Sequence, residues 1–180
     1  QMLIKRHDML RAIILPSGQQ QVLAEVSAYS IISYDFTQAD EATINRHLET
    51  VRREMFTRSF SPEQWPLFDI RFSQLPAQEL RIHFSLDMLI ADWGSYEILL
   101  REWAQLYHQP SPSLPALTLS FRDYVLAERK IRETDRYQRA ATYWQERLSR
   151  LPAAPELPLA VVPSTLKSAK FKRHRAFLEP

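Results

Sequence analysis

The stretch HFSLDMLIADWGS, residues 83–95, contains the point where a strand gives way to a helix. Polar and apolar residues alternate up to Asp87, which is typical of a strand with one buried face. From about Ser95 onward, apolar residues recur every three or four positions, as on one face of a helix. The corner therefore carries two carboxylates, Asp87 and Asp92, and the hydroxyl of Ser95. These side chains can perform acid–base chemistry, bind a metal or only hold the corner together.

The sequence before this corner predicts a small sheet and one long helix. The turn PSGQ joins the two halves of a hairpin over residues 11–26, and a short strand follows over 30–36. A helix begins after Asp40, a suitable N-cap residue. Residues 66–75 and 80–87 both alternate polar with apolar side chains, so they predict an antiparallel pair. The helix has one apolar face, formed by Ile44, Leu48, Val51 and Met55.

After the corner, the pattern changes from strands to helices. The helix that begins near Ser95 ends before Pro110, because the residue preceding a proline disfavours helical backbone. Two more helices are predicted over 120–132 and 135–150. Residues 152–163 are rich in proline and are predicted to be extended.

The C-terminal segment, residues 167–180, is basic at its start, with five Lys or Arg and no acid between 167 and 175. Such a cluster can bind phosphate or nucleic acid, but Phe171 and Phe177 favour a strand with one solvated face. We predict the strand. The whole pattern indicates a single α+β domain over residues 1–180.

Composition excludes several classes of protein. The chain of 180 residues is 45% hydrophobic and 24% charged, which is typical of a soluble globular domain. It lacks cysteine, so disulfides and thiolate chemistry are excluded, and its two glycines are too few for a phosphate-binding loop. The net charge of +2 is too small to indicate nucleic acid, and no apolar run is long enough to span a membrane. We expect a cytoplasmic protein that contacts neither nucleic acid nor a membrane.

The corner residues favour anchoring over catalysis. His83 and Asp87 share a strand face but lie about 13 Å apart, which excludes a serine–histidine–aspartate triad built on this strand. The candidate metal ligands do not cluster, so no metal is expected. Asp92, at the start of a helix, should be ionised and form an N-cap with Ser95. Asp87 can face a cleft, where burial would raise its pKa and suit it to proton transfer, but anchoring is favoured here too.

The segment DMLIADWGS, residues 87–95, fits the pattern Asp-x4-Asp-x2-Ser and resembles the heterocyclization domains of nonribosomal peptide synthetases. Ordinary condensation domains carry a double-histidine motif at this corner. With Asp92 as the shared aspartate, Asp87 and Met88 take the places of the two histidines. Met88 thus replaces the histidine usually credited with condensation. Four other stretches resemble the family in the right order, namely RHDMLRA (6–12), RREMFTRSFSPEQWPLFDIR (52–71), LSFRDYVLAE (119–128) and LPAAPELPLAVVP (151–163).

This resemblance implies a chloramphenicol-acetyltransferase-like lobe with a mixed or antiparallel sheet packed against helices. Two such lobes face each other across a tunnel in the family, and the resemblance covers only the N-terminal lobe. Residues 167–180 then lead toward the missing C-terminal lobe. Peptidyl or aryl carrier proteins bring thioester substrates on 4'-phosphopantetheine arms, and no cofactor is bound directly. The family joins an acyl group to cysteine, serine or threonine and cyclodehydrates the product to a thiazoline or oxazoline, often in siderophore biosynthesis.

The resemblance also implies roles for individual residues. Asp87, Asp92 and Ser95 are the motif residues, with largely structural roles, and Arg11 is the expected cation for Asp92. The residues expected in the substrate tunnel are His83, Ser85 and Met88.

Two other functions remain open. A carrier-dependent or CoA-dependent acyltransferase of the same superfold would usually need a histidine at the corner, which Met88 disfavours. A non-catalytic module that docks carrier proteins would use the basic segment 167–175 against an acidic partner. We expect this chain alone to be inactive.

Overall fold

The computed structural model divides the chain into two compact units, Gln1–Phe121 and Arg122–Pro180. The single domain over residues 1–180 stays a prediction. Among the described residues, the helices of the second unit contain no buried residue. The predicted strand over 167–180 lies outside the described residues, except for 176–177. The structure describes residues 1–109, 114–153, 155, 158–159, 161–165 and 176–177.

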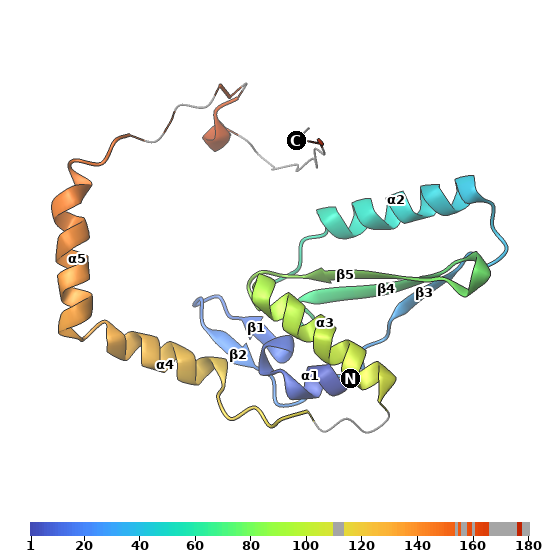
Figure 1. Cartoon of the computed structure of the whole chain (residues 1–180), viewed down its shortest axis with the longest axis horizontal. Helices are drawn as coiled ribbons and strands as arrows, with labels where there is room; N and C mark the ends of the chain where they lie inside the picture. The colour runs from blue at the N-terminus through green and yellow to red at the C-terminus, as the bar shows by residue number, and fades with distance from the viewer. Residues whose placement is uncertain (110–113, 154, 156–157, 160, 166–175, 178–180) are drawn as a thin grey trace. The chain divides into compact units, whose positions relative to one another are not determined.

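Up to residue 109, the described part of the first unit contains two small sheets and three α-helices (Figure 1). The predicted hairpin, the strand after it, the long helix and the antiparallel pair are all confirmed. A 3-10 turn, η1 (Asp8–Arg11), leads from the first helix into the hairpin. The elements are α1 (Met2–Arg6), β1 (Ala12–Ile14), β2 (Gln20–Val22), β3 (Ile32–Asp35), α2 (Glu41–Thr57), β4 (Phe68–Gln74), β5 (Leu80–Leu86) and α3 (Trp93–His108).

The larger sheet is mixed and has the strand order β3-β4-β5. β3 runs parallel to β4, with Ile32 opposite Arg71. β4 and β5 are antiparallel, with Phe68 opposite Leu86. β1 and β2 form a separate antiparallel pair, in which Ala12 lies opposite Val22. β4 is therefore the central strand of the sheet from which the Asp87 corner emerges.

One face of the larger sheet builds the apolar core. The indole of Trp103 on α3 lies 6.4 Å from the rings of both Phe72 and Phe84, which point to the same side of the sheet. Burial of this apolar surface is the main force that docks α3. The buried core residues are Ile4, Leu10, Ala12, Leu67, Phe68, Ile90 and Leu99.

The opposite face of β4 is polar and equally buried. Asp69, Arg71 and Ser73 are 2%, 8% and 0% exposed. Helix α2 covers this face with Val51 and Met55, both buried (Figure 1). The alternation in the sequence separated the two faces correctly, but it did not indicate that the polar face would be buried as well.

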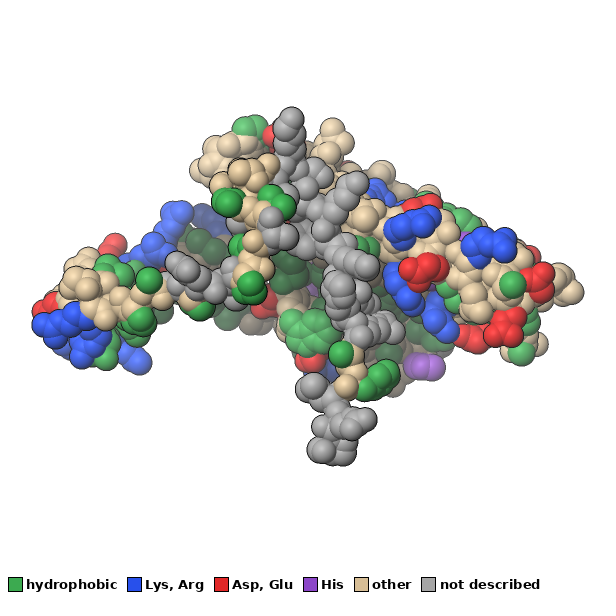
Figure 2. Space-filling model, turned by 90° about the horizontal axis from the view of Figure 1, so that it is seen from above, with side chains coloured by type: hydrophobic (Ala, Val, Ile, Leu, Met, Phe, Trp, Pro, Cys, Tyr) green, Lys and Arg blue, Asp and Glu red, His purple; other side chains and the backbone are tan. Residues whose placement is uncertain are grey.

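The outer surface of α2 carries charges of both signs. Its Asp40 N-cap accepts a hydrogen bond from the Thr43 N–H at 2.7 Å, as the sequence predicted. Figure 2 shows basic and acidic side chains interspersed over this helix. One exposed pair, Arg52 and Glu49, lies at 3.2 Å. This charged surface explains why only one stripe of α2 is apolar.

The second unit contains α4 (Phe121–Ile131) and α5 (Asp135–Leu148). The Thr134 hydroxyl accepts a hydrogen bond from the Tyr137 N–H at 3.3 Å and caps α5. A short 3-10 turn, η3 (Pro163–Thr165), follows the proline-rich segment. Across the described residues, no helix is both long and apolar enough to cross a membrane.

Candidate functional site

The corner between β5 and α3 is held first by Asp87. Its backbone N–H donates to the Leu67 carbonyl at 3.0 Å, which continues the sheet by one residue. Its carboxylate accepts a hydrogen bond from the Leu89 N–H at 2.9 Å, and its carbonyl accepts one from the Ile90 N–H at 3.1 Å. This turn inserts Ile90, 5% exposed, into the core. Asp87 therefore organises the turn, as an aspartate at a turn commonly does.

Asp92 and Ser95 form a complete capping box at the start of α3. The Asp92 Oδ1 accepts hydrogen bonds from both the N–H and the hydroxyl of Ser95, each at 2.7 Å. In return, the Asp92 N–H donates to the Ser95 Oγ at 3.3 Å. The hydroxyl and the N–H of Ser95 lower the pKa of Asp92 below its ordinary value. The N-cap that the sequence predicted is confirmed.

Arg11 does not bind Asp92, contrary to the expectation from the sequence. Its guanidinium bonds Asp8 at 2.8 Å and the carbonyl oxygens of Ile4 and Lys5 at 2.6 and 2.7 Å. Its Nε donates to the Leu23 carbonyl at 3.1 Å. Arg11 binds groups close to it in the sequence for a physical reason. Arg11 satisfies carbonyl groups at the end of a short helix, while Ser95 already satisfies Asp92.

The expected tunnel residues lie in different surroundings. Met88, next to Asp87, is 74% exposed. Ser85 is half-buried on β5. His83 lies farther back on the same strand, where its Nε2 is 2.9 Å from the Ser73 Oγ. The structure thus brings Asp87, Met88, Asp92 and Ser95 to one corner but places His83 in another polar cluster.

That second cluster, which the sequence did not reveal, consists of His47, Ser73 and His83. The Ser73 Oγ lies 2.9 Å from the Nε2 of each histidine. A hydroxyl can donate to one imidazole and accept from the other, which satisfies both rings in their neutral forms. Burial lowers the pKa of both histidines, and nearby positive charges lower that of His83 further. Strand alternation places Ser73 and His83 on one face, but nothing in the sequence brings His47 there.

The His47 ring is also held by aromatic neighbours. It stacks on Phe36 at a centroid distance of 4.0 Å and meets Tyr34 at 4.8 Å. These contacts tie α2 to β3, and the Ser73 contact ties it to the central strand. The cluster is therefore a built part of the lobe's interior.

A buried ionic network holds the rest of α2 against β4. Arg71 binds Asp69 at 3.1 Å and Glu54 at 2.8 Å, and Arg58 binds Asp69 at 2.6 Å. Burial by itself would lower the pKa of Arg71, but hydrogen bonds to Glu54 and Asp69 outweigh it and raise that pKa. The Tyr29 hydroxyl accepts from the Ile70 N–H at 2.8 Å beside this network. These contacts are structural, because each charged group of the network already has a partner among the described residues.

The Arg-His pair at residues 6–7 is explained by Glu102 of α3. This buried carboxylate accepts hydrogen bonds from the Arg6 Nε at 3.0 Å and pairs with the His7 Nε2 at 2.7 Å. Burial would raise the pKa of Glu102, but its bonds to Arg6 and His7 lower it. The pair therefore fastens α1 to α3.

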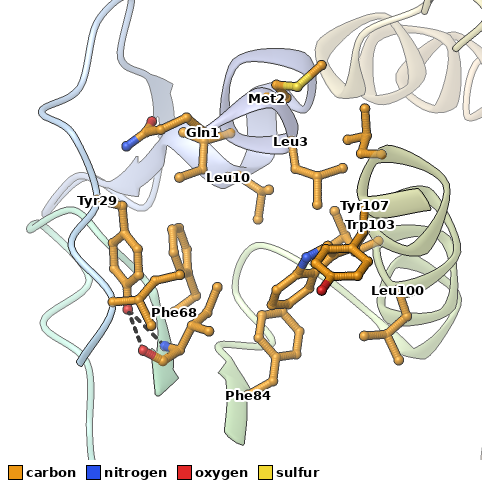
Figure 3. A pocket seen from close by; sticks show the side chains of 15 residues that line it. Gln1, Met2, Leu3, Leu10, Tyr29, Phe68, Phe84, Leu100, Trp103 and Tyr107 are labelled. Atoms are coloured by element: carbon orange, nitrogen blue, oxygen red, sulfur yellow. Dashed lines mark hydrogen bonds between the residues drawn. The ribbon is translucent and has the colours of Figure 1, made fainter. Parts of the chain in front are cut away.

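An apolar cavity of about 300 Å³ lies between α1, α3 and the sheet (Figure 3). Tyr29, Phe68, Phe84 and Trp103 point into it. The Tyr29 hydroxyl, one of its polar groups, already accepts a hydrogen bond from the Ile70 N–H. The lining residues do not include Asp87, Asp92 or Ser95, so the cavity is separate from the corner.

The family model of the condensation domain matches residues 1–179. The chain is 38% identical over 179 residues to bacitracin synthase 1 of Bacillus licheniformis, covering 99% of this chain and 3% of that protein. It is 34% identical over 177 residues to pyochelin synthetase PchF of Pseudomonas aeruginosa, covering 98% of this chain and 10% of that protein. The matched relatives are therefore much longer than this chain.

A solved structure shows the same fold. The EpoB cyclization–docking bidomain from Sorangium cellulosum, part of a nonribosomal peptide synthetase, aligns with a TM-score of 0.80 and 36% identity. The alignment covers 91% of this chain and 33% of that one. The expected α+β lobe with a mixed sheet and packed helices is confirmed by this similarity. The chain belongs to the condensation domain family of nonribosomal peptide synthetases.

Proposed function

We propose that this chain is the N-terminal part of a heterocyclization domain. In this proposal the domain joins a carrier-bound acyl group to the amine of carrier-bound cysteine, serine or threonine. The side-chain thiol or hydroxyl then attacks the new amide, and loss of one water gives a thiazoline or oxazoline. The observation that carries the proposal is the corner itself, where Asp87, Asp92 and Ser95 fit the heterocyclization motif and Met88 stands in place of a histidine.

The geometry of the corner supports different roles for the two carboxylates, Asp87 and Asp92. Asp92 is committed to Ser95 and has a lowered pKa, so it is a poor proton donor and serves to fix the start of α3. The Asp87 Oδ1 binds the Leu89 N–H, and its second carboxylate oxygen has no hydrogen-bond partner among the described residues. Asp87 is therefore the motif carboxylate available to a substrate.

Met88 supports cyclization over simple condensation. A thioether offers neither a proton donor nor a base near neutral pH. Its side chain is exposed beside Asp87, where an incoming substrate can reach it. In the proposal, Met88 and Ser85 line the tunnel with Asp87. His83 lies on the same strand, but its contact with Ser73 belongs to the separate polar cluster, so the proposal gives it no contact with the substrate.

Carrier proteins deliver both substrates on phosphopantetheine arms in this proposal. Tethering raises the effective concentration of each substrate, so the lobe does not need a deep binding pocket of its own. The chain spans only 33% of the similar EpoB structure, which supports the expectation that a second lobe completes the tunnel. The chain by itself should therefore turn over no carrier-bound substrate.

Reconstitution with a second lobe tests the function. The chain would be mixed with the part of the EpoB bidomain outside the matched third, an acyl-loaded donor carrier and a cysteine-loaded acceptor carrier. Intact mass of the acceptor should show acyl transfer followed by loss of one water, only with both lobes present. Acyl transfer without water loss would contradict heterocyclization. Carrier binding with no transfer at all would favour the docking module, and turnover by the chain alone would contradict its dependence on a second lobe.

A further inference from the structure

A pair of stacked aromatic rings, one exposed and one half-buried, adjoins the Asp87–Ser95 motif. The Trp93 side chain directly follows Asp92 and is 71% exposed. Its ring stacks on that of Tyr96, with 5.4 Å between centroids and 24° between planes. Because one face of the indole is covered by Tyr96 and the side chain is still largely exposed, the other face is open. We call these two residues the aromatic platform.

Two contacts hold the platform in place. The indole N–H of Trp93 donates to the Glu97 Oε1 at 3.2 Å, which fixes the ring's rotation. The Tyr96 ring lies 5.5 Å from Phe84 on β5, and Phe84 in turn contacts Trp103. The platform is thus the outer end of an aromatic series rooted in the sheet. A preformed surface loses little conformational entropy when a ligand binds.

The chemistry of the platform selects its ligand. With the indole N–H occupied by Glu97, the open face of Trp93 offers a π surface and no hydrogen-bond donor. The carboxylates of Glu97 and Asp92 lie beside the platform and disfavour an anionic ligand. Met88 and Leu89, 74% and 45% exposed, add apolar surface on the turn before the platform. A flat aromatic group without a negative charge fits these features.

We infer that the aromatic platform of Trp93 and Tyr96 binds the planar ring of an aromatic acyl donor at the motif corner. This inference rests on the proposed function, because it takes the corner to be where carrier-bound acyl groups react. Trp93 is then a specificity-determining residue that distinguishes an aryl donor from an aliphatic one. Stacking of one ring gives roughly a three- to tenfold preference.

Indole N–H signals of the ¹⁵N-labelled chain test the inference without any turnover. The chain has four tryptophans, so four signals are followed while S-benzoyl-pantetheine or S-acetyl-pantetheine is added. The Trp93 signal should move with the benzoyl probe, and half-saturate at a roughly three- to tenfold lower concentration than with the acetyl probe. For variants that lack the Trp93 signal, binding is followed by saturation transfer to the protons of each probe, and Trp93→Ala should abolish the preference for the benzoyl probe. Trp93→Phe, which keeps a ring, should retain part of it.

Trp144→Ala is the matched control, because Trp144 is 58% exposed on α5, away from the motif in sequence. This variant should retain the benzoyl preference. Equal responses to the two probes, no response at Trp93, or similar shifts at Trp93 and Trp144 would overturn the inference. These results are independent of the reconstitution assay. The reconstituted domain could cyclise both aryl and aliphatic donors while the platform binds the two probes equally. That result would contradict the inference but not the proposed function.

Discussion

A single carboxylate oxygen of Asp92 accepts two hydrogen bonds from Ser95, one from its N–H and one from its hydroxyl, each at 2.7 Å. These hydrogen bonds fix the residue at which α3 begins. They therefore also fix how the helix continues from the turn that carries Asp87. The cap is therefore the first feature of the corner to test.

Replacing Asp92 by alanine should lower the melting temperature by roughly 2–4 °C, because the Ser95 N–H loses its acceptor. Asp92→Asn keeps an acceptor oxygen and should lose less. Circular dichroism melts of both variants measure the difference. Equal melting temperatures for Asp92→Ala and the unchanged chain would show that the cap does not stabilise the lobe.

Stability should fall as the pH drops below the ordinary histidine pKa of about 6.5, because the pKa values of His47 and His83 are both lowered in the folded lobe. In that range the unfolded chain binds protons that the folded chain does not. The contribution is fully present above that pH and is lost toward the lower folded-state pKa values. Urea unfolding between pH 5 and 8 would measure it, and His83→Gln should weaken the slope.

Removal of the Arg71 guanidinium should destabilise the lobe strongly. Arg71→Ala leaves Asp69, only 2% exposed, with Arg58 as its remaining cation. We expect a loss of about 3 kcal/mol in the free energy of unfolding. Arg52→Ala is the control, since the Arg52–Glu49 pair is exposed and should contribute less than about 1 kcal/mol. Similar losses in the two variants would contradict a special role for the buried network.

Loss of the Glu102 carboxylate should free α1 from α3. Glu102→Ala removes the acceptor of both Arg6 and His7 and should lower the unfolding free energy by about 1–3 kcal/mol. Hydrogen exchange of the α1 amides should speed up more than that of the β4 amides. Gln105 is exposed on the same helix, so Gln105→Ala should change neither the unfolding free energy nor the exchange of the α1 amides. Unchanged protection of α1 in Glu102→Ala would refute the tether.

Asp87→Asn tests whether the negative charge of Asp87 is needed for activity, independently of its hydrogen bond in the turn. The amide oxygen can still accept the Leu89 N–H, so the melting temperature should barely change. In the reconstituted domain, cyclization should nevertheless slow by on the order of a hundredfold, because the ionised carboxylate is lost. Intact-mass time courses of the acceptor carrier measure this rate. Cyclization at the normal rate would leave Asp87 with a structural role only.

The sequence predicted most of the corner, because its signals are local. Alternation located β4 and β5, and the spacing of Asp92 and Ser95 is that of a capping box, so the cap could be predicted without any long-range information. Arg11 was assigned the wrong partner because its real partners, Asp8 and nearby carbonyl groups, depend on how a short helix ends.

Contacts between elements that are far apart in the sequence could not be predicted from such local signals. Alternation places Ser73 and His83 on one face, but the arrival of His47 depends on the docking of α2. The parallel pairing of β3 with β4 likewise depends on the crossover through α2. The open face of Trp93 could not be recognised either, since an aromatic residue in a helix usually signals core.

The central strand β4 separates two interiors of different chemistry, aromatic and aliphatic toward α3, ionic and hydrogen-bonded toward α2. The two sides therefore respond to different conditions. Salt acts on the ionic network toward α2 and on the pairing of Glu102 with Arg6, whereas loss of apolar volume acts on the aromatic and aliphatic side of β4. The layer behind the sheet can thus vary in charge while the Asp87 corner, which is held by its own local hydrogen bonds, keeps its shape.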